Sequence, residues 1–343
     1  MVKSIYSKHA ICLIAIFTVG NAMLYFPRHE DALQGLFGLM IAFAFAAIYY
    51  IFAGIILQNF DLTNCGKIKK IVLVILGTAL SVISAAATLK DYTDYVADYR
   101  LKSTSKTIII ILAAIAVYFI ATAKKEAIFK LAIVSAVYSA ITTVTFFVIS
   151  IPQFSFDNML PLELNLNVTL KSALILFARC FGEIITLIFL FRQVPKKQGI
   201  KAFLLGLLFA VLLLSVCILN IIFVFGRGVS AKLDLPYVEA MSIISLGDTF
   251  TRFEGFEFLT YFLFSIIKSA AAVFCVTNIF EQAANVNKKL SAAISCFIIF
   301  VMCLLMQQQL FYSNIFIVGL VVIEIVLLLF SINIRKIGIQ KRC

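Results

Sequence analysis

Ten apolar runs follow one another along this chain, and most are long enough to cross a lipid bilayer. Each needs about 20 mainly apolar residues to do so. With 63% of the 343 residues hydrophobic and only 13% charged, the apolar surface exceeds what one soluble core can cover. The sequence therefore predicts an all-α polytopic membrane protein with about ten transmembrane helices. The runs cover about 9–26, 32–59, 70–89, 107–123, 130–151, 171–193, 200–226, 255–282, 289–308 and 313–333.

No polar insert separates the runs, so residues 1–343 are expected to form a single transmembrane domain. An even number of spans divides into residues 9–151, a first five-helix repeat, and residues 171–333, a second five-helix repeat. Spans 1 and 6 would then enter the membrane from opposite sides, as in an inverted repeat. This repeat is a hypothesis from topology, because the two halves share no clear sequence identity.

The basic residues indicate the orientation. With the N-terminus in the cytoplasm, 18 of the 29 Lys and Arg residues lie on the cytoplasmic side and 9 on the outer side. The remaining two, Arg179 and Lys268, lie inside spans. This bias favours a multi-pass membrane protein with both termini cytoplasmic. It also explains the net charge of +12 by clusters between apolar runs, so no nucleic acid partner is expected.

The sequence contains no recognisable catalytic or metal-binding motif. Its eight cysteines form no CxxC pair, and both histidines lie near span ends. The GxSxG, Walker and HExxH patterns are absent from the sequence. We therefore expect no enzyme activity, no metal site and no cofactor.

Span 1 carries a candidate helix break near mid-membrane, at Thr18, Gly20, Asn21 and Ala22. Glycine weakens a helix, and an asparagine in lipid is costly without a partner. A break here would free backbone N–H groups that could bind an anion such as a carboxylate. The alternative is a notch of small residues that packs against a neighbouring helix.

Span 6 carries charged residues beside a glycine, in the run Arg179-Cys180-Phe181-Gly182-Glu183. Ionisable residues inside a span are expensive and usually face a partner or a water-filled cavity. Arg179 and Glu183 are four residues apart and could pair on one helix face. In the functional interpretation, Gly182 marks a second break beside a buried carboxyl.

Lys268 lies in the middle of span 8. A buried lysine must lose its charge, pair or reach water. Its candidate partners are Glu183 on span 6 and Glu324 on span 10. The result could be a structural ion pair, or a fixed ammonium that stands where related folds bind a coupling cation.

The loop between spans 7 and 8 predicts a short amphipathic helix on the outer surface, folded back over the spans. Pro236 suits a helix start, and Gly247 can end the helix. The predicted apolar face consists of Tyr237, Ala240, Met241 and Ile244.

Several stretches together resemble the spore germination receptor B subunits, the GerAB-type endospore germination permeases. The most specific is the loop after span 7. The resemblance extends over essentially the whole chain. It rests on Leu235-Pro236-Tyr237, Ile243-Ile244-Ser245-Leu246-Gly247-Asp248, Arg252-Phe253-Glu254, Gly20-Asn21-Ala22-Met23-Leu24-Tyr25-Phe26-Pro27, Leu160-Pro161 and Phe181-Gly182-Glu183.

The resemblance implies a member of the amino acid–polyamine–organocation superfamily with a LeuT-like 5+5 inverted repeat and broken spans 1 and 6. It implies a location in the spore inner membrane, with an A subunit and a lipoprotein C subunit as partners and a small-molecule germinant, often an amino acid, as ligand. Two departures stand out: the chain has no Trp, and Asn21-Ala22 replaces a richer Gly/Ser break. The implied ligand-binding residues are Thr18, Gly20, Asn21, Ala22, Phe181, Gly182 and Glu183.

The leading hypothesis is a transporter-like subunit that senses a nutrient germinant at mid-membrane between spans 1 and 6. The alternative is a secondary amino acid transporter that cycles through alternating access. A third hypothesis is a subunit that helps to line a channel and binds nothing small. Sensor and transporter would use the same site, so the sequence leaves these open.

Overall fold

The computed structural model describes residues 2–20, 22–25, 31–57, 66–123, 125–160, 162–187, 189, 196–243, 254–305 and 313–331. Nearly all of these residues are helical. The α-helices are α1 (Val2–Val19), α2 (Ala22–Tyr25), α3 (Ala32–Leu57), α4 (Lys67–Tyr95), α5 (Lys106–Thr122), α6 (Lys125–Ser150), α7 (Leu166–Leu176), α9 (Lys196–Ser230), α10 (Pro236–Ile243), α11 (Glu254–Ala284), α12 (Lys288–Leu305) and α14 (Asn314–Ser331). The π and 3-10 segments are η2 (Val96–Arg100), η3 (Ile151–Gln153), η4 (Phe156–Met159), η5 (Phe177–Phe181) and η6 (Gly182–Leu187).

Helices dominate because lipid offers the backbone no hydrogen-bond partners, so a spanning segment must satisfy its own N–H and C=O groups. By length and composition, six helical segments could cross a membrane, and three shorter apolar helices accompany them. The six are Ala32–Ala53, Lys67–Arg100, Glu126–Gln153, Gly199–Ser230, Gly255–Ala284 and Lys288–Leu305. The apolar helices predicted from the sequence are confirmed, whereas the count of ten spans stays a prediction.

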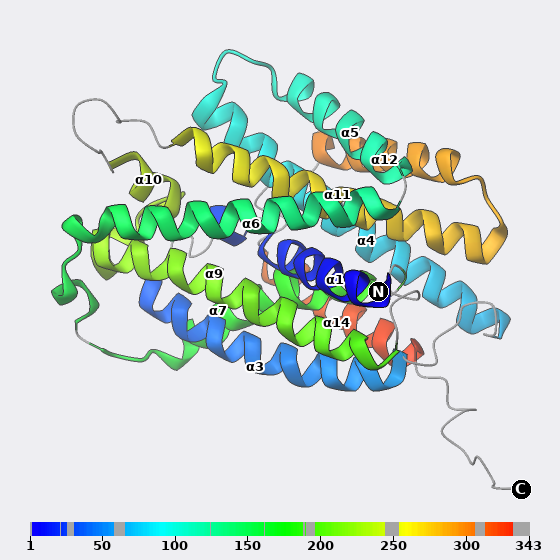
Figure 1. The fold of residues 1–343 in the computed structure, drawn as a ribbon, viewed down its shortest axis with the longest axis horizontal. Helices are drawn as coiled ribbons and strands as arrows, with labels where there is room; N and C mark the ends of the chain where they lie inside the picture. The colour runs from blue at the N-terminus through cyan, green and yellow to red at the C-terminus, as the bar shows by residue number, and fades with distance from the viewer. Residues whose placement is uncertain are drawn as a thin grey trace, which may run out of the picture.

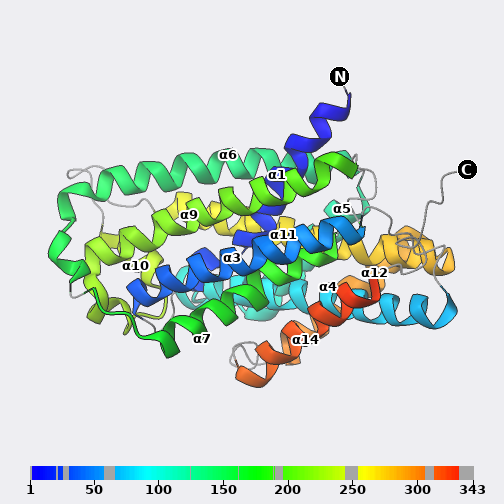
Figure 2. The same ribbon diagram turned by 90° about the horizontal axis from the view of Figure 1, so that it is seen from below.

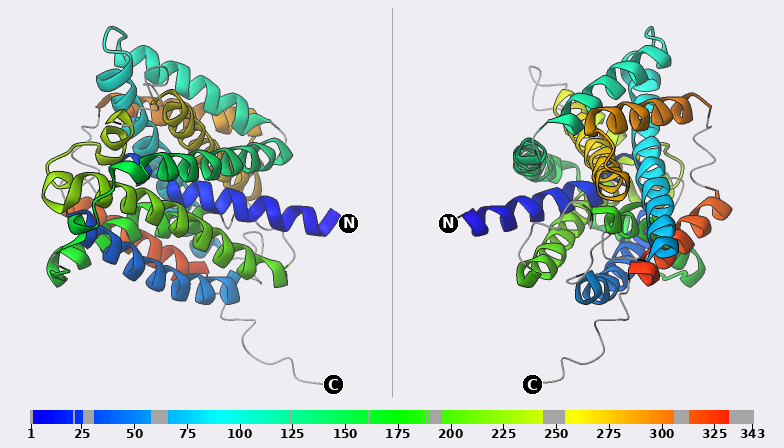
Figure 3. Two further views of the ribbon diagram at one scale, coloured as in Figure 1. Left: turned by 60° about the vertical axis from the view of Figure 1, so that its left-hand side comes forward. Right: turned by 90° about the vertical axis from the view of Figure 1, so that its right-hand side faces the viewer.

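The long helices form a bundle around α1 (Figures 1 and 2). The α5 and α12 helices lie together along one edge in Figure 1, while α3 and α7 lie along the opposite edge. Between them α1 packs against α6 and α9, and the end views show its N-terminal half leaving the bundle (Figure 3). The C-terminal end of α1, where the predicted break lies, is therefore at the centre of the molecule.

The α11 helix is the most enclosed span, with 83% of its apolar window buried, against 33% for α12. It packs on α4, and small side chains on both helices, including Ala85 and Ala270, are fully buried. Small residues allow helix backbones to approach closely in a membrane protein. Ser269 Oγ also donates a hydrogen bond to the Ala85 carbonyl, at 3.4 Å. This packing fixes α11 and, with it, Lys268.

The outer helices of the bundle expose large apolar side chains, as expected of a surface that faces lipid. Phe119 of α5 and Phe297 of α12 are each 66% exposed, and Ile315 of α14 is 88% exposed. A soluble protein seldom exposes such a large apolar area. The exposed faces therefore agree with a multi-pass membrane protein.

The third span is longer than the sequence predicts. The apolar run ends at residue 89, but α4 and η2 continue the helix to Arg100. No Gly or Pro interrupts residues 90–100, and Asp91 is fully buried and bonded to another helix. The segment between the predicted third and fourth spans is thus largely helix, and the connection to α5 is confined to residues 101–105.

The loop helix predicted from Pro236 is confirmed as α10, which begins at that proline. Tyr237, Ala240 and Met241 are buried, and α10 contacts α2, α9 and α11. It therefore covers the end of the bundle at which α2 lies. The structure describes α10 only to Ile243, so Ile244 and the predicted end at Gly247 lie outside the described residues.

Candidate functional site

The break predicted in span 1 is present. The α1 helix ends at Val19, Gly20 follows in a left-handed conformation with φ of +38°, and α2 begins at Ala22. A side chain at such a φ is strained, so glycine suits this position. The Gly20 amide still donates to the Ile16 carbonyl at 2.8 Å, which completes the last turn of α1.

The space beside Gly20 is filled by Lys268, which reaches it from α11. A Cβ atom on Gly20 would lie 2.8 Å from Lys268 Cδ and 3.1 Å from Lys268 Nζ. The ammonium also lies 5.3 Å from the centre of the Phe17 ring, within the range of a cation–π contact. The break in span 1 therefore makes room for a buried lysine side chain.

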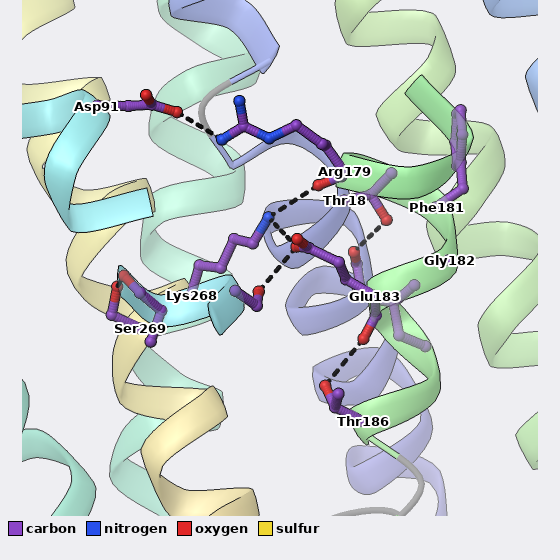
Figure 4. A network of polar contacts seen from close by, with 12 residues as sticks. Thr18, Asp91, Arg179, Phe181, Gly182, Glu183, Thr186, Lys268 and Ser269 are labelled. Atoms are coloured by element: carbon purple, nitrogen blue, oxygen red, sulfur yellow. Dashed lines mark hydrogen bonds and ion pairs between the residues drawn. The ribbon is translucent and has the colours of Figure 1, made fainter. Parts of the chain in front are cut away.

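Lys268 forms an ion pair with Glu183, with 2.7 Å between Nζ and Oε2 (Figure 4). Only 4% of the lysine side chain and 2% of the glutamate side chain are exposed. The ammonium also donates to the carbonyl of Arg179, at 3.2 Å. Ser84 of α4 donates to the same Glu183 Oε2, at 2.7 Å. One carboxylate oxygen thus joins α4 and α11 to η6.

The sixth span changes its helix type rather than unwinding at Gly182. The α7 helix passes into the π-helical η5 and then, at Gly182, into the 3-10 helix η6. Gly182 keeps helical angles, with φ of −66° and ψ of −39°. The expectation of a full break at this residue is therefore wrong for the described residues. Changes of this kind within a span redirect carbonyl groups and are frequent at functional sites.

The carbonyls at this junction already have partners. Tyr50 of α3 donates its hydroxyl hydrogen bond to the carbonyl oxygens of Phe181 and, at 3.2 Å, Gly182. Tyr50 is 1% exposed, and its ring stacks on Phe203 with 5.2 Å between centroids. A buried tyrosine normally finds a partner for its hydroxyl group. Tyr50 therefore ties α3 to the irregular part of span 6.

Gly182 has its own steric reason to be glycine, and it differs from that of Gly20. A Cβ atom on Gly182 would overlap the carboxylate of Glu324, which lies on α14 and is fully buried. Tyr49 Oη donates to the backbone carbonyl of Glu324, at 3.1 Å. Of the two partners considered for Lys268, Glu183 forms the ion pair, while Glu324 packs on Gly182.

Arg179 forms a separate buried ion pair beside this cluster. Its Nη2 lies 2.8 Å from Oδ2 of Asp91, with 10% and 0% of the two side chains exposed (Figure 4). Arg179 and Glu183 therefore do not pair with each other on one helix face: Arg179 pairs with Asp91, and Glu183 pairs with Lys268. The π-helical turn of η5 separates the two residues differently from an α-helix.

The comparisons with known proteins agree with this geometry. Residues 4–312 match the family model described as spore germination protein, or spore permease. The chain belongs to this family. A search of the curated proteins returned no match. Among solved structures, a Na⁺-coupled sialic acid symporter in its substrate-bound outward-open state is similar over 96% of this chain and 79% of its own, with a TM-score of 0.59 and 9% identity.

At 9% identity this likeness concerns the fold, which is the LeuT-type transporter fold that the family resemblance implies. The germination permease is therefore a transporter-like, multi-pass membrane protein of a family of permeases. Family and fold imply a small-molecule substrate. Among the described residues, no group of three or more His, Cys, Asp and Glu side chains could hold a metal ion.

The structure brings together most of the residues selected from the sequence. Gly20, Glu183 and Lys268 meet at the centre, and Gly182 joins Glu324 to them. Thr18 is buried, but its hydroxyl group donates to the Ile14 carbonyl within α1. The remaining predicted residues divide as follows: Ala22 and Phe181 are buried, and Asn21 lies outside the described residues.

Sequence reasoning missed three residues of the site: Ser84, Asp91 and Tyr50. Asp91 carried a usable signal, because it lies two residues after the end of an apolar run with no helix-breaking residue before position 100. Ser84 and Tyr50 carried none, since serine and tyrosine occur throughout these apolar runs. Their roles depend on which face of each helix turns inward.

Proposed function

We propose that this germination permease is the nutrient-sensing subunit of a spore germination receptor. The ligand is a small germinant that carries a carboxylate and an amine, most simply an amino acid, and it binds between spans 1 and 6. The observation that supports this site is the buried Lys268 ammonium, which lies beside Gly20 and pairs with Glu183. A membrane protein retains such a costly group where it serves a ligand pathway.

The ion pair offers one partner for each end of an amino acid. The ligand carboxylate would pair with Lys268 beside the span 1 break, because the four residues of α2 make too short a helix to bind an anion alone. The ligand ammonium would pair with Glu183. Exchanging the internal pair for two pairs with the ligand stabilises one conformer over another, and this bias is the signal.

Lys268 would also take the place of a coupling cation. Its ammonium is held by a carboxylate and a backbone carbonyl, which are oxygen ligands that suit a bound Na⁺ equally well. Ligand binding should then be independent of sodium. Sodium-dependent binding by the unmodified protein would contradict this role.

The signal would pass to partner subunits. On the family resemblance we propose an A subunit and a lipoprotein C subunit as partners in the spore inner membrane, with both termini of this chain in the cytoplasm. The α10 helix covers α2 and contacts α11, so a movement of either helix at the ligand site would reach the outer surface.

The second candidate function is secondary transport of an amino acid, which the transporter fold favours. The two functions differ in a measurable result. A transporter accumulates labelled amino acid in proteoliposomes, whereas a sensor binds it without net uptake. Net uptake that Gly20→Val abolishes would establish the transporter and exclude a pure sensor.

The test of the ligand site is a binding assay with the purified protein and the amino acids in turn. We expect saturable binding by the unmodified protein, a loss of at least tenfold in affinity in Lys268→Met, and no change in Lys201→Met, which removes an exposed lysine of α9. Equal affinities in the two variants would place the ligand elsewhere.

A further inference from the structure

The centre of the bundle contains more acidic groups than basic ones. Lys268 neutralises Glu183, with 2.7 Å between their charged atoms. Glu324 packs on Gly182, the residue before Glu183, and is 0% exposed. If all three groups were ionised, the cluster would carry a net negative charge out of contact with water. An uncompensated buried charge costs several kcal/mol.

The contacts of Glu324 favour a neutral carboxyl. In the part of the chain that the structure describes, neither of its carboxylate oxygens has a hydrogen-bond partner. The Tyr49 hydroxyl group donates to the Glu324 backbone, not to its side chain. Burying a carboxyl without partners costs far more when it is ionised than when it holds a proton.

The titratable and charged groups that face Glu324 come from the elements packed against α14 and from α11. None of them forms an ion pair with Glu324 among the interactions of the described residues. Glu183 of η6, Tyr49 and Tyr50 of α3 and Lys268 of α11 interact with its charge, while η5 and α4 contribute Arg179, Cys180 and Asp91 to the elements in contact with α14.

We propose that Glu324 is a proton-binding site. Its carboxyl holds a proton at neutral pH while it packs on Gly182. When η5 and η6 move and this contact loosens, the O–H bond breaks, the electron pair stays on the carboxylate and the proton passes to water. The carboxylate then competes with Glu183 for Lys268. Proton occupancy of α14 is thereby linked to the conformation of span 6, which goes beyond the proposed function and requires no germinant.

The experiment is infrared difference spectroscopy, in which the spectrum of each purified full-length variant is subtracted from that of the unmodified protein. A protonated carboxyl and a carboxylate absorb at different frequencies. At neutral pH we expect a protonated-carboxyl band that shifts in D₂O and is lost in Glu324→Gln. This substitution keeps the shape of the side chain and removes no ion pair, so the variant should fold.

A matched control is Glu257→Gln, which changes another buried carboxyl of the bundle, 2% exposed, on α11. We expect the difference band assigned to Glu324 to persist in this variant. A second variant, Glu183→Gln, leaves Lys268 without its carboxylate partner, so Glu324 should ionise and its band should weaken. A Glu324→Gln spectrum identical to that of the unmodified protein, or a band unchanged in Glu183→Gln, would overturn the proposal.

Discussion

The two interrupted spans carry glycines for different physical reasons. At Gly20 the chain leaves the helix with a positive φ, so the backbone itself demands glycine. At Gly182 the backbone stays helical, and the demand comes from the Glu324 carboxyl group on another helix. A glycine inside a span therefore marks a structural constraint. The constraint comes either from the glycine's own backbone conformation or from a neighbouring side chain.

The two interruptions are joined by Lys268, so this residue should show the largest effect on stability. In Lys268→Met, Glu183 loses its ion-pair partner in a buried site, and we expect a cost of about 3–5 kcal/mol. The measurement is thermal unfolding in detergent. The double variant Lys268→Met/Glu183→Gln should recover much of the loss, since no charge is then left unpaired; a double variant as unstable as the single one would argue against the pair.

The cause assigned to Gly182 predicts the next largest effect. Gly182→Ala introduces a Cβ atom where the Glu324 carboxyl group lies, and such overpacking costs about 1–3 kcal/mol. Shortening the neighbour in Gly182→Ala/Glu324→Ala should restore the melting temperature in part. If the loss of stability in the double variant equalled the sum of the losses in the two single variants, Glu324 would not be the constraint.

The cause assigned to Gly20 predicts a smaller effect that no neighbouring substitution removes. Gly20→Ala places a Cβ on a left-handed residue, at a cost of about 1–2 kcal/mol. The Lys268 side chain can shift slightly, since its nearest atom, Cδ at 2.8 Å, belongs to the flexible stem. In the double variant Gly20→Ala/Glu324→Ala, the unfolding temperature should fall below that of the unmodified protein by the sum of the two single effects. Rescue by Glu324→Ala would erase the distinction between the glycines.

The smallest expected effect concerns Tyr50, which supports only the span 6 junction. Tyr50→Phe removes the hydroxyl group that donates to Phe181 and Gly182 but keeps the ring stacked on Phe203. We expect a loss of about 1 kcal/mol, the usual net worth of one hydrogen bond. Tyr118→Phe on α5 is the control and should be neutral within the error of the melting curve.

Local features were predictable from the sequence, while their partners were only partly so. Gly20 inside an apolar run indicates a break by itself, and Lys268 in mid-span indicates that an acid must be near. The choice of Glu183 over Glu324 depends on how α11, α14 and η6 are rotated about their axes. That rotation is set by packing across the whole bundle, such as the contact of α4 with α11.

The length of α4 shows the same limit. Hydrophobicity predicted a span that ends at residue 89, because Lys90, Asp91 and Asp94 are charged. In the structure these residues continue the helix, and each charge has an opposite charge nearby: Lys90 pairs with Asp94, at 3.2 Å, and Asp91 with Arg179. Pairing lowers the cost of burying a charge. The Asp91 partner is distant in the sequence, so hydrophobicity along the chain could not reveal it.

The covalent attachment of Lys268 has a thermodynamic consequence. An ion that dissociates occupies its site according to its concentration on either side of the membrane, whereas a tethered ammonium has a fixed, high effective concentration at Glu183. The occupancy of this position is therefore independent of the ionic composition of the surroundings. A tethered cation carries no gradient energy, so this ion pair cannot by itself couple to an ion gradient across the membrane.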